Sequence, residues 1–164
     1  MAHACTRTTI APTMLRGGSK LNIIPDHVEL DVDMRMLPGQ SVDDTRAQQR
    51  AALGDHAGAV EVQEVSSHEA TNSPTDTPLW DALQRVSRQF YDDAALLPML
   101  MPGTTDARFF RDLGATAYGY GMFSTKIAFE ELATMGHGDN ERVDVESLRL
   151  STELWEALIT EFLG

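Results

Sequence analysis

Cysteine is nearly absent from this sequence, and long apolar runs are absent altogether. The single cysteine, Cys5, excludes an internal disulfide and any thiolate-rich zinc site. No apolar run approaches the roughly 20 residues that a membrane-spanning helix needs. The N-terminus, MAHACTRTT, has no apolar stretch of the kind that a secretory signal carries. These absences predict a protein of the reducing cytoplasm that has no membrane partner.

Basic residues are also scarce. The chain carries 13 Lys and Arg against 25 Asp and Glu, which gives a net charge of -12 and a pI near 4.6. Such a surface repels nucleic-acid phosphates, so nucleic acid is not an expected partner. The acidic residues are spread along the chain and do not form a tail, and we therefore interpret the charge as a source of solubility.

The first part of the chain has the pattern strand, strand, helix, strand. The β-branched stretch 5–15 predicts a strand, and the strict alternation of 28–35 predicts a half-buried partner that forms an antiparallel hairpin with it. Ser41 and the acid three residues later are typical of a capped helix, which runs to about Leu53. A short strand is expected over 59–65, and the polar segment 66–78 is the best linker.

The second part alternates helices and strands. Pro78 is placed to open a helix, strands are expected at 96–101 and 115–121, and a helix at 106–112. Asp144 is expected to cap the last helix, whose apolar stripe is predicted to be Leu148, Trp155, Leu158 and Phe162. The fold class is therefore α/β, or α+β for the whole chain, with helices packed on a sheet.

The stretch ATMGHGDNERVDVESLRL, residues 133–150, places His137 between two glycines just before the last helix. Flanking glycines let a backbone bend close to a metal ion, yet a lone histidine in a loop is more often no ligand at all. From the residues alone the second interpretation is favoured. The remaining histidines show no ligand spacing and are expected at surface or loop positions; they are His3, His27, His56 and His68.

A second candidate site follows the Pro-Gly turn at 102–103. Hydroxyl groups and the start of a helix after such a turn are typical of an anion pocket, and the residues concerned are Gly103, Thr104, Thr105 and Arg108. The competing interpretation is a simple strand-to-helix turn in which Thr105 or Asp106 caps the helix. Arg35, at the end of the second strand, is by itself best explained as an exposed ion pair with Asp31 or Asp33.

Four segments, in order, resemble one family. They are GGSKLNIIPDHVELDVDMRMLPG at 17–39, GTTDARFF at 103–110, AYGYG at 117–121 and HGDNERVDVESL at 137–148. Each is similar to a signature of the zinc-dependent amidohydrolases and exopeptidases that include acetylornithine deacetylase, succinyl-diaminopimelate desuccinylase, aminoacylase and glutamate carboxypeptidase. Together these segments span nearly the whole chain.

The resemblance implies two parts. Residues 5–66 resemble the later part of a ferredoxin-like lid, or dimerisation, domain, and residues 70–164 resemble the C-terminal part of an α/β/α catalytic domain. The first half of that catalytic domain would precede Met1. Most zinc ligands and the general base of the family belong to it, so the resemblance implies that this chain alone is inactive.

The resemblance also assigns roles to individual residues. His137 would be the one metal ligand in this chain, in a parent site of two zinc ions, and Glu141 would order its loop. Asn22, Arg35, Gly103, Thr104, Thr105 and Arg108 would bind the substrate and its carboxylate. The implied reaction is metal-assisted hydrolysis of a peptide or N-acyl amide bond next to a free carboxylate, with no catalytic base from this chain.

Two other interpretations stay open. The chain could be a non-catalytic module that self-associates as a homodimer through the lid strands, because an open edge at 5–15 invites pairing. It could also be one half of a split enzyme whose other half is a separate polypeptide.

Overall fold

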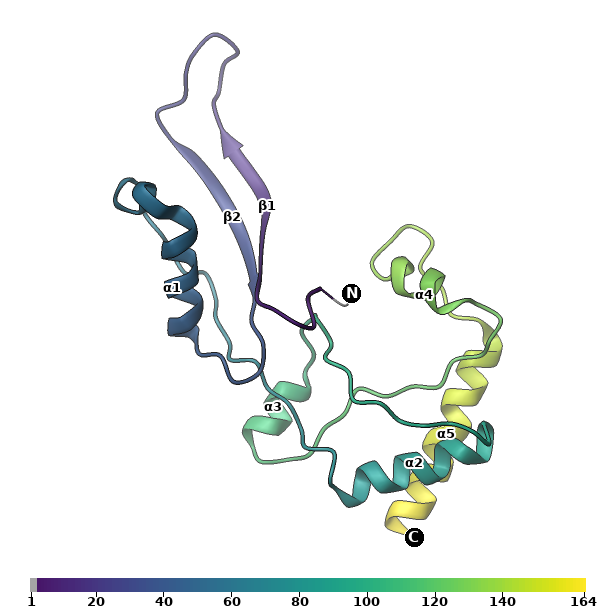
Figure 1. The fold of residues 1–164 in the computed structure, drawn as a ribbon. Helices are drawn as coiled ribbons and strands as arrows, with labels where there is room; N and C mark the ends of the chain where they lie inside the picture. Colours follow the sequence, from purple (N-terminus) through teal and green to yellow (C-terminus); the bar gives the residue numbers. More distant parts are fainter. Residues whose placement is uncertain (1–2) are drawn as a thin grey trace. The chain divides into compact units, whose positions relative to one another are not determined.

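The computed structural model describes residues 3–164 and has a mixed α/β fold (Figure 1). The described chain forms two compact units. The first contains the chain up to Asn72 together with Met99–Arg108, and the second contains Ser73–Pro98 together with Phe109–Gly164. The two domains predicted from the sequence have different boundaries, and their division stays a prediction.

A long hairpin dominates the first unit. Strand β1 (Thr9–Gly17) pairs antiparallel with β2 (Val28–Arg35), from Thr9 opposite Arg35 to Gly17 opposite Val28. The predicted hairpin is thus confirmed, although β1 lies four residues later at its start than the expected 5–15. The register shifts between Pro12 and Met14, where proline supplies no N–H to the ladder. Most of β1 is exposed, and so are the first three residues of β2, Val28–Leu30, next to the turn.

Helix α1 (Val42–Leu53) follows the sequence signals closely. Ser41 caps it through a complete capping box with Asp44: the Ser41 Oγ accepts from the Asp44 N–H, and the Asp44 carboxylate accepts from the Ser41 N–H. Gly54 ends the helix with φ of 53°. A short 3₁₀ helix, η1 (Gly54–Ala59), comes next and was not expected from the sequence.

In the second unit, α2 (Pro78–Phe90) packs against α5 (Val145–Leu163). Pro78 opens α2 as predicted, and Asp144 caps α5. The core lies between the two helices and contains Ala82, Leu83, Val86, Met122, Leu150, Leu154 and Leu158. The predicted apolar stripe of α5 was therefore largely wrong, since Leu148, Trp155 and Phe162 are 59%, 42% and 45% exposed.

Three predicted strands do not form. Residues 59–65, 96–101 and 115–121 have no strand assignment, and the only sheet among residues 3–164 is the β1–β2 pair. A strand is defined by hydrogen bonds to a neighbour, and these segments have no β partner within the described chain. The prediction of these three strands was wrong, because the partner that a strand needs cannot be found in a local pattern.

Two short helices complete the second half. Helix α3 (Ala107–Asp112) confirms the expected helix at 106–112, and α4 (Phe129–Met135) was not predicted. No helix within residues 3–164 combines the length and apolar character that crossing a lipid bilayer requires.

Candidate functional site

The loop after Met101 is tied to the end of β2. The Arg35 guanidinium donates from Nη1 to the Pro102 carbonyl, and its Nε donates to the Asp33 carboxylate over 2.7 Å. The sequence offered two interpretations of Arg35, and the ion pair with Asp33 is present. Because Pro102 directly precedes Gly103, the hydrogen bond from Arg35 also brings Arg35 next to the predicted anion loop within the first unit.

The anion loop itself is open. Gly103, Thr104 and Thr105 are exposed, while Arg108 is half-buried at the start of α3. The backbone N–H of Arg108 donates to the Thr105 carbonyl over 3.4 Å, which begins the helical turn. A Cβ at Gly103 would lie no closer than 3.7 Å to Met101 and 3.9 Å to the Arg35 Nη1, so packing within this chain does not require a glycine here.

Asn22 lies apart from these residues. It is exposed in the turn beyond the Gly17–Val28 pair, whereas Arg35 pairs with Thr9 at the other end of the hairpin. Seven residue steps along β2 separate these ends, or about 23 Å at roughly 3.3 Å per residue. The structure therefore does not bring Asn22 to the side of the hairpin where Arg35 and Gly103 meet.

His137 lies in the second unit, in the exposed loop between α4 and α5. Its φ of 63° is the only positive value of a non-glycine residue in the described chain. Its backbone N–H donates to the Glu141 carboxylate over 3.0 Å, and the Glu141 N–H donates to the Gly138 carbonyl over 3.2 Å. The left-handed conformation of His137 is thus held by Glu141, in agreement with the ordering role expected for that residue.

A further anchor of this loop was missed by sequence reasoning. The Arg142 guanidinium pairs with the Glu131 carboxylate on α4 and donates to the Asn140 carbonyl over 3.0 Å. This contact depends on α4, which we did not predict. The paired acids Glu130 and Glu131 in its first turn were the available signal, because acidic side chains stabilise the start of a helix.

The start of α5 is fixed more firmly. The Asp144 carboxylate accepts from the Ser147 hydroxyl over 2.6 Å, from the Ser147 N–H over 2.9 Å and from the Ser124 hydroxyl over 2.9 Å. The Ser147 hydroxyl bond, above all, lowers the pKa of Asp144 to about 2. The loop that carries His137 therefore leads into a helix whose first turn is held by three hydrogen bonds to Asp144.

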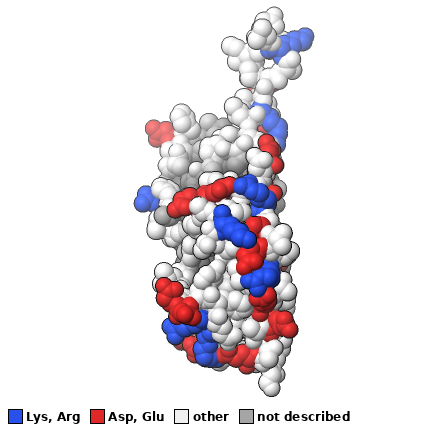
Figure 2. Space-filling view, turned by 90° about the vertical axis from the view of Figure 1, so that its right-hand side faces the viewer, with Lys and Arg blue, Asp and Glu red and all other residues white. Residues whose placement is uncertain are grey.

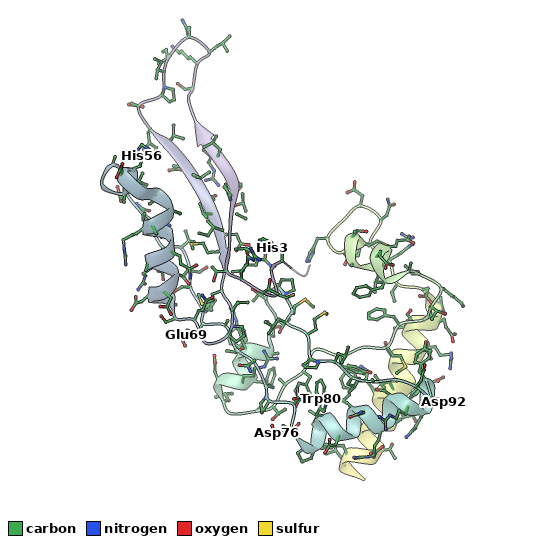
Figure 3. All side chains as sticks on the ribbon, viewed as in Figure 1. His3, His56, Glu69, Asp76, Trp80 and Asp92 are labelled. Atoms are coloured by element: carbon green, nitrogen blue, oxygen red, sulfur yellow. The ribbon has the colours of Figure 1, made fainter. Side chains whose placement is uncertain are left out.

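The described residues do not make a zinc site by themselves. Catalytic zinc is held by three protein ligands, and nowhere in residues 3–164 do three or more His, Cys, Asp or Glu side chains gather in an arrangement that could hold a metal ion. The Glu141 carboxylate is already engaged by the His137 backbone. Figure 3 labels His3 and His56, which lie in different parts of the first unit and do not point toward one another.

Charge on the visible face is mixed. Figure 2 shows acidic and basic side chains interspersed, with no broad patch of either sign. Arg149 on α5 illustrates this, because it pairs with Glu146 and Glu153 one turn away on either side. Such exposed pairs contribute little to stability.

Comparisons with known proteins identify the first unit. The family model described as peptidase dimerisation domain matches residues 2–61. These residues include the β1–β2 hairpin and α1. The chain belongs to the M20 peptidase and aminoacylase family.

Individual relatives match most of the chain. It is 30% identical over 159 residues to the N-fatty-acyl-amino acid synthase/hydrolase PM20D1 of Xenopus tropicalis, which covers 96% of this chain and 30% of the relative. It is 25% identical to the probable carboxypeptidase S-like 2 of Dictyostelium discoideum, with 95% and 30% covered. It is 28% identical to the aminoacylase-1 of Homo sapiens, with 69% and 28% covered.

The length of these M20 relatives limits what the match implies. The chain spans about a third of the length of the curated relatives that it matches. Their names denote a synthase/hydrolase, a carboxypeptidase and an aminoacylase, so the family is one of hydrolases. No solved structure matches the chain significantly.

Proposed function

We propose that this chain is the C-terminal portion of an M20 hydrolase that cleaves a peptide or N-acyl amide bond next to a free carboxylate. One observation carries the proposal: Arg35 of the dimerisation-domain hairpin holds the loop that begins at Gly103. A cationic side chain thus contacts the residue before a loop that carries two exposed threonines, Thr104 and Thr105. These groups suit recognition of a carboxylate.

The contacts of Arg35 refine its role. Its Nε donates to Asp33 and its Nη1 to the Pro102 carbonyl, which leaves Nη2 as the end of the guanidinium that can meet a ligand. Arginine usually binds a carboxylate through two parallel N–H donors, and some of the Arg35 donors are already engaged within the chain. Arg35 then positions the loop and adds one charged donor, while the Thr104 and Thr105 hydroxyls supply the others.

His137 is proposed to be one zinc ligand of the parent enzyme. No group of side chains within residues 3–164 fits a complete zinc site, and on this proposal the other ligands and the general base come from a part of the parent enzyme that this chain does not span. On this proposal the chain alone does not hydrolyse substrate. The single cysteine favours a reducing cytoplasm as its location.

Hydrolysis of N-acyl amino acids tests the proposal. The chain is compared with a chimera in which it replaces the matching segment of the Xenopus tropicalis relative. The chimera is expected to cleave an N-acyl amino acid, and to bind the corresponding carboxamide much more weakly because that substrate lacks the free carboxylate. Normal hydrolysis by the 164-residue chain alone would refute the inactivity, and equal KM values for acid and carboxamide would refute the carboxylate pocket.

A second candidate function is self-association. The outer edge of β1 has no neighbouring strand within the described chain, and Met14 and Leu15 on it are exposed. An open apolar edge is prone to pair with another chain, and the matched family model is a dimerisation domain. Light scattering at high concentration decides: a homodimer supports this function, and a strict monomer argues against it.

A further inference from the structure

A cluster of hydrogen bonds joins Arg111 of α3 to two other segments of the second unit. The Arg111 Nε donates to the Ser73 Oγ over 3.1 Å and to the Ala117 carbonyl over 3.2 Å, and its Nη2 donates to the same carbonyl over 2.6 Å. The Ser73 Oγ also accepts from the Ala117 N–H and donates to the Ala117 carbonyl, each over 3.1 Å. The hydroxyl of Ser73 thus uses its one donor and both of its acceptor positions within this cluster.

The groups that accept from Arg111 are themselves attached to the first turn of α2. The Tyr118 hydroxyl lies 2.6 Å from the Thr77 Oγ1 and donates to the Pro74 carbonyl over 2.5 Å. Thr77 is the N-cap of α2, and the Trp80 ring packs edge-on against Tyr118 with the ring centroids 5.4 Å apart. Arg111 therefore connects α3 to a part of the second unit that several independent contacts hold in place.

Helix α3 needs such an attachment. It is six residues long, none of them is buried, and Phe109 and Phe110 are 53% and 59% exposed. A helix of this length is not stable by itself, because the cost of nucleation exceeds what so few hydrogen bonds return. The contacts of the half-buried Arg111 side chain therefore help to fix where α3 lies and how it is rotated about its axis.

The loop that begins at Gly103 runs directly into α3. The Arg108 N–H donates to the Thr105 carbonyl, which begins the helical turn. Arg108 and Arg111 are three residues apart, so they are neighbours on one face of the helix. A rotation of α3 that took Arg111 away from its acceptors would therefore also redirect Arg108. Arg35 holds the segment before this loop, at Pro102, and Arg111 holds the helix after it.

We infer that Arg111 is a positioning residue for substrate recognition. Its hydrogen bonds to Ser73 and Ala117 set the orientation of α3, and α3 sets the direction of Arg108 and of the end of the loop at Gly103. Arg111 acts through these residues and is assigned no contact with the substrate. The inference rests on the proposed function and deepens it, because it names a residue outside the loop on which the preference for a free carboxylate depends.

The preference for a carboxylate tests the inference in the chimera with the Xenopus tropicalis relative. Arg111→Ala is expected to raise KM for the N-acyl amino acid by about five- to tenfold, because a misdirected loop loses charge-assisted hydrogen bonds to the carboxylate. KM for the corresponding carboxamide is expected to change by less than about twofold, and kcat by less than about threefold. A merely structural role would instead reduce the folded fraction, which lowers kcat for both substrates and leaves both KM values unchanged.

Two further variants separate geometry from charge. Ser73→Ala keeps every charge of the chain and removes the hydroxyl that accepts from Arg111, so it is expected to raise KM for the acid by about two- to threefold. It also replaces Arg111→Ala as the test if that variant does not fold. Arg85→Ala is the control, because Arg85 is a cation of the same unit that pairs with Glu161 on α5. It is expected to keep KM within about twofold of the parent value.

Hydrogen exchange in the 164-residue chain tests the hold on α3 without any use of hydrolysis. The Ala115 N–H donates to the Phe110 carbonyl over 2.9 Å at the end of α3. Its exchange is expected to be about fivefold faster in Arg111→Ala than in the parent. Unchanged exchange would show that Arg111 does not hold α3, and would overturn the inference.

The kinetic results distinguish this inference from the proposed function. An acid KM that Arg111→Ala leaves unchanged, or that rises in Arg111→Ala but not in Ser73→Ala, would overturn the inference while the proposed function stands. The second of these results would mean that the charge of Arg111 acts on the substrate without any need for its hydrogen bonds to Ser73. Equal KM values for acid and carboxamide in the parent chimera would refute the proposed function, and with it the positioning role that rests on it.

Discussion

The Arg35 guanidinium donates to the Pro102 carbonyl, although 67 residues separate the two along the chain. This contact joins the end of the dimerisation-domain hairpin to the residue before Gly103. Its consequence is that the candidate carboxylate loop is held by a side chain from the hairpin, so a change in the hairpin is expected to reach substrate binding.

Substitution of Arg35 should affect substrate binding more than the chemical step. In the chimera with the Xenopus tropicalis relative, Arg35→Ala is expected to raise KM for an N-acyl amino acid by about tenfold, since charge-assisted hydrogen bonds contribute about 1.5–3 kcal/mol. The kcat is expected to change less than threefold or so. Arg16→Ala is the control, because Arg16 pairs with Asp31 and Glu29 on the same hairpin and not with the loop at Gly103. Equal effects of both variants would contradict the assignment.

The loop of His137 should depend on Glu141 as an acceptor. Glu141→Ala removes the carboxylate that accepts the His137 N–H, so exchange of this amide is expected to accelerate by about tenfold. Glu141→Gln retains an acceptor oxygen and is expected to preserve much of the protection. Residue-resolved hydrogen exchange by NMR measures both. If Glu141→Ala leaves the amide protected, something else holds the left-handed conformation of His137.

Acid should weaken the start of α5. Hydrogen bonds from Ser147 and Ser124 lower the pKa of Asp144 to about 2 from an ordinary value of 3.8. A lowered folded-state pKa means that the stabilisation is complete above the unfolded value and is lost as the pH falls from about 4 to about 2. Urea unfolding at several pH values should show this loss. Ser147→Ala removes the strongest donor and should shrink the pH dependence; an unchanged slope would exclude Asp144 as its source.

Two leucines on α5 should differ sharply in their contribution to stability. Leu154 is 0% exposed between α2 and α5, so Leu154→Ala is expected to cost about 2–5 kcal/mol. Leu148 on the same helix is 59% exposed, so Leu148→Ala should lower the free energy of unfolding by no more than about 0.5 kcal/mol. Urea denaturation followed by circular dichroism compares them. Similar losses would mean that the core is not where the structure places it.

Local signals in the sequence predicted the helices well. Ser41 and Asp44 form the expected capping box, and Pro78 and Asp144 open their helices as predicted. Each of these features is decided by residues within four positions of one another. The helix α4 was missed because it has no side-chain cap.

Features that depend on distant partners were predicted less well. Residues 115–121 were expected to form a strand, but no strand within residues 3–164 pairs with them. Helix α5 has two apolar faces, and only the position of α2 decides that Leu150 and Leu154 are buried while Trp155 is not. The contact between Arg35 and Pro102 likewise joins residues that no local pattern connects. The roles of Asn22 and His137 stay predictions.

Zinc content measures the central claim most directly. The 164-residue chain is dialysed against a zinc-buffered solution and analysed for zinc per chain. We expect close to none, because His137 is the one proposed ligand and catalytic zinc needs three. One or two tightly held zinc ions per chain would contradict the account, since this chain would then build a complete site from its own residues.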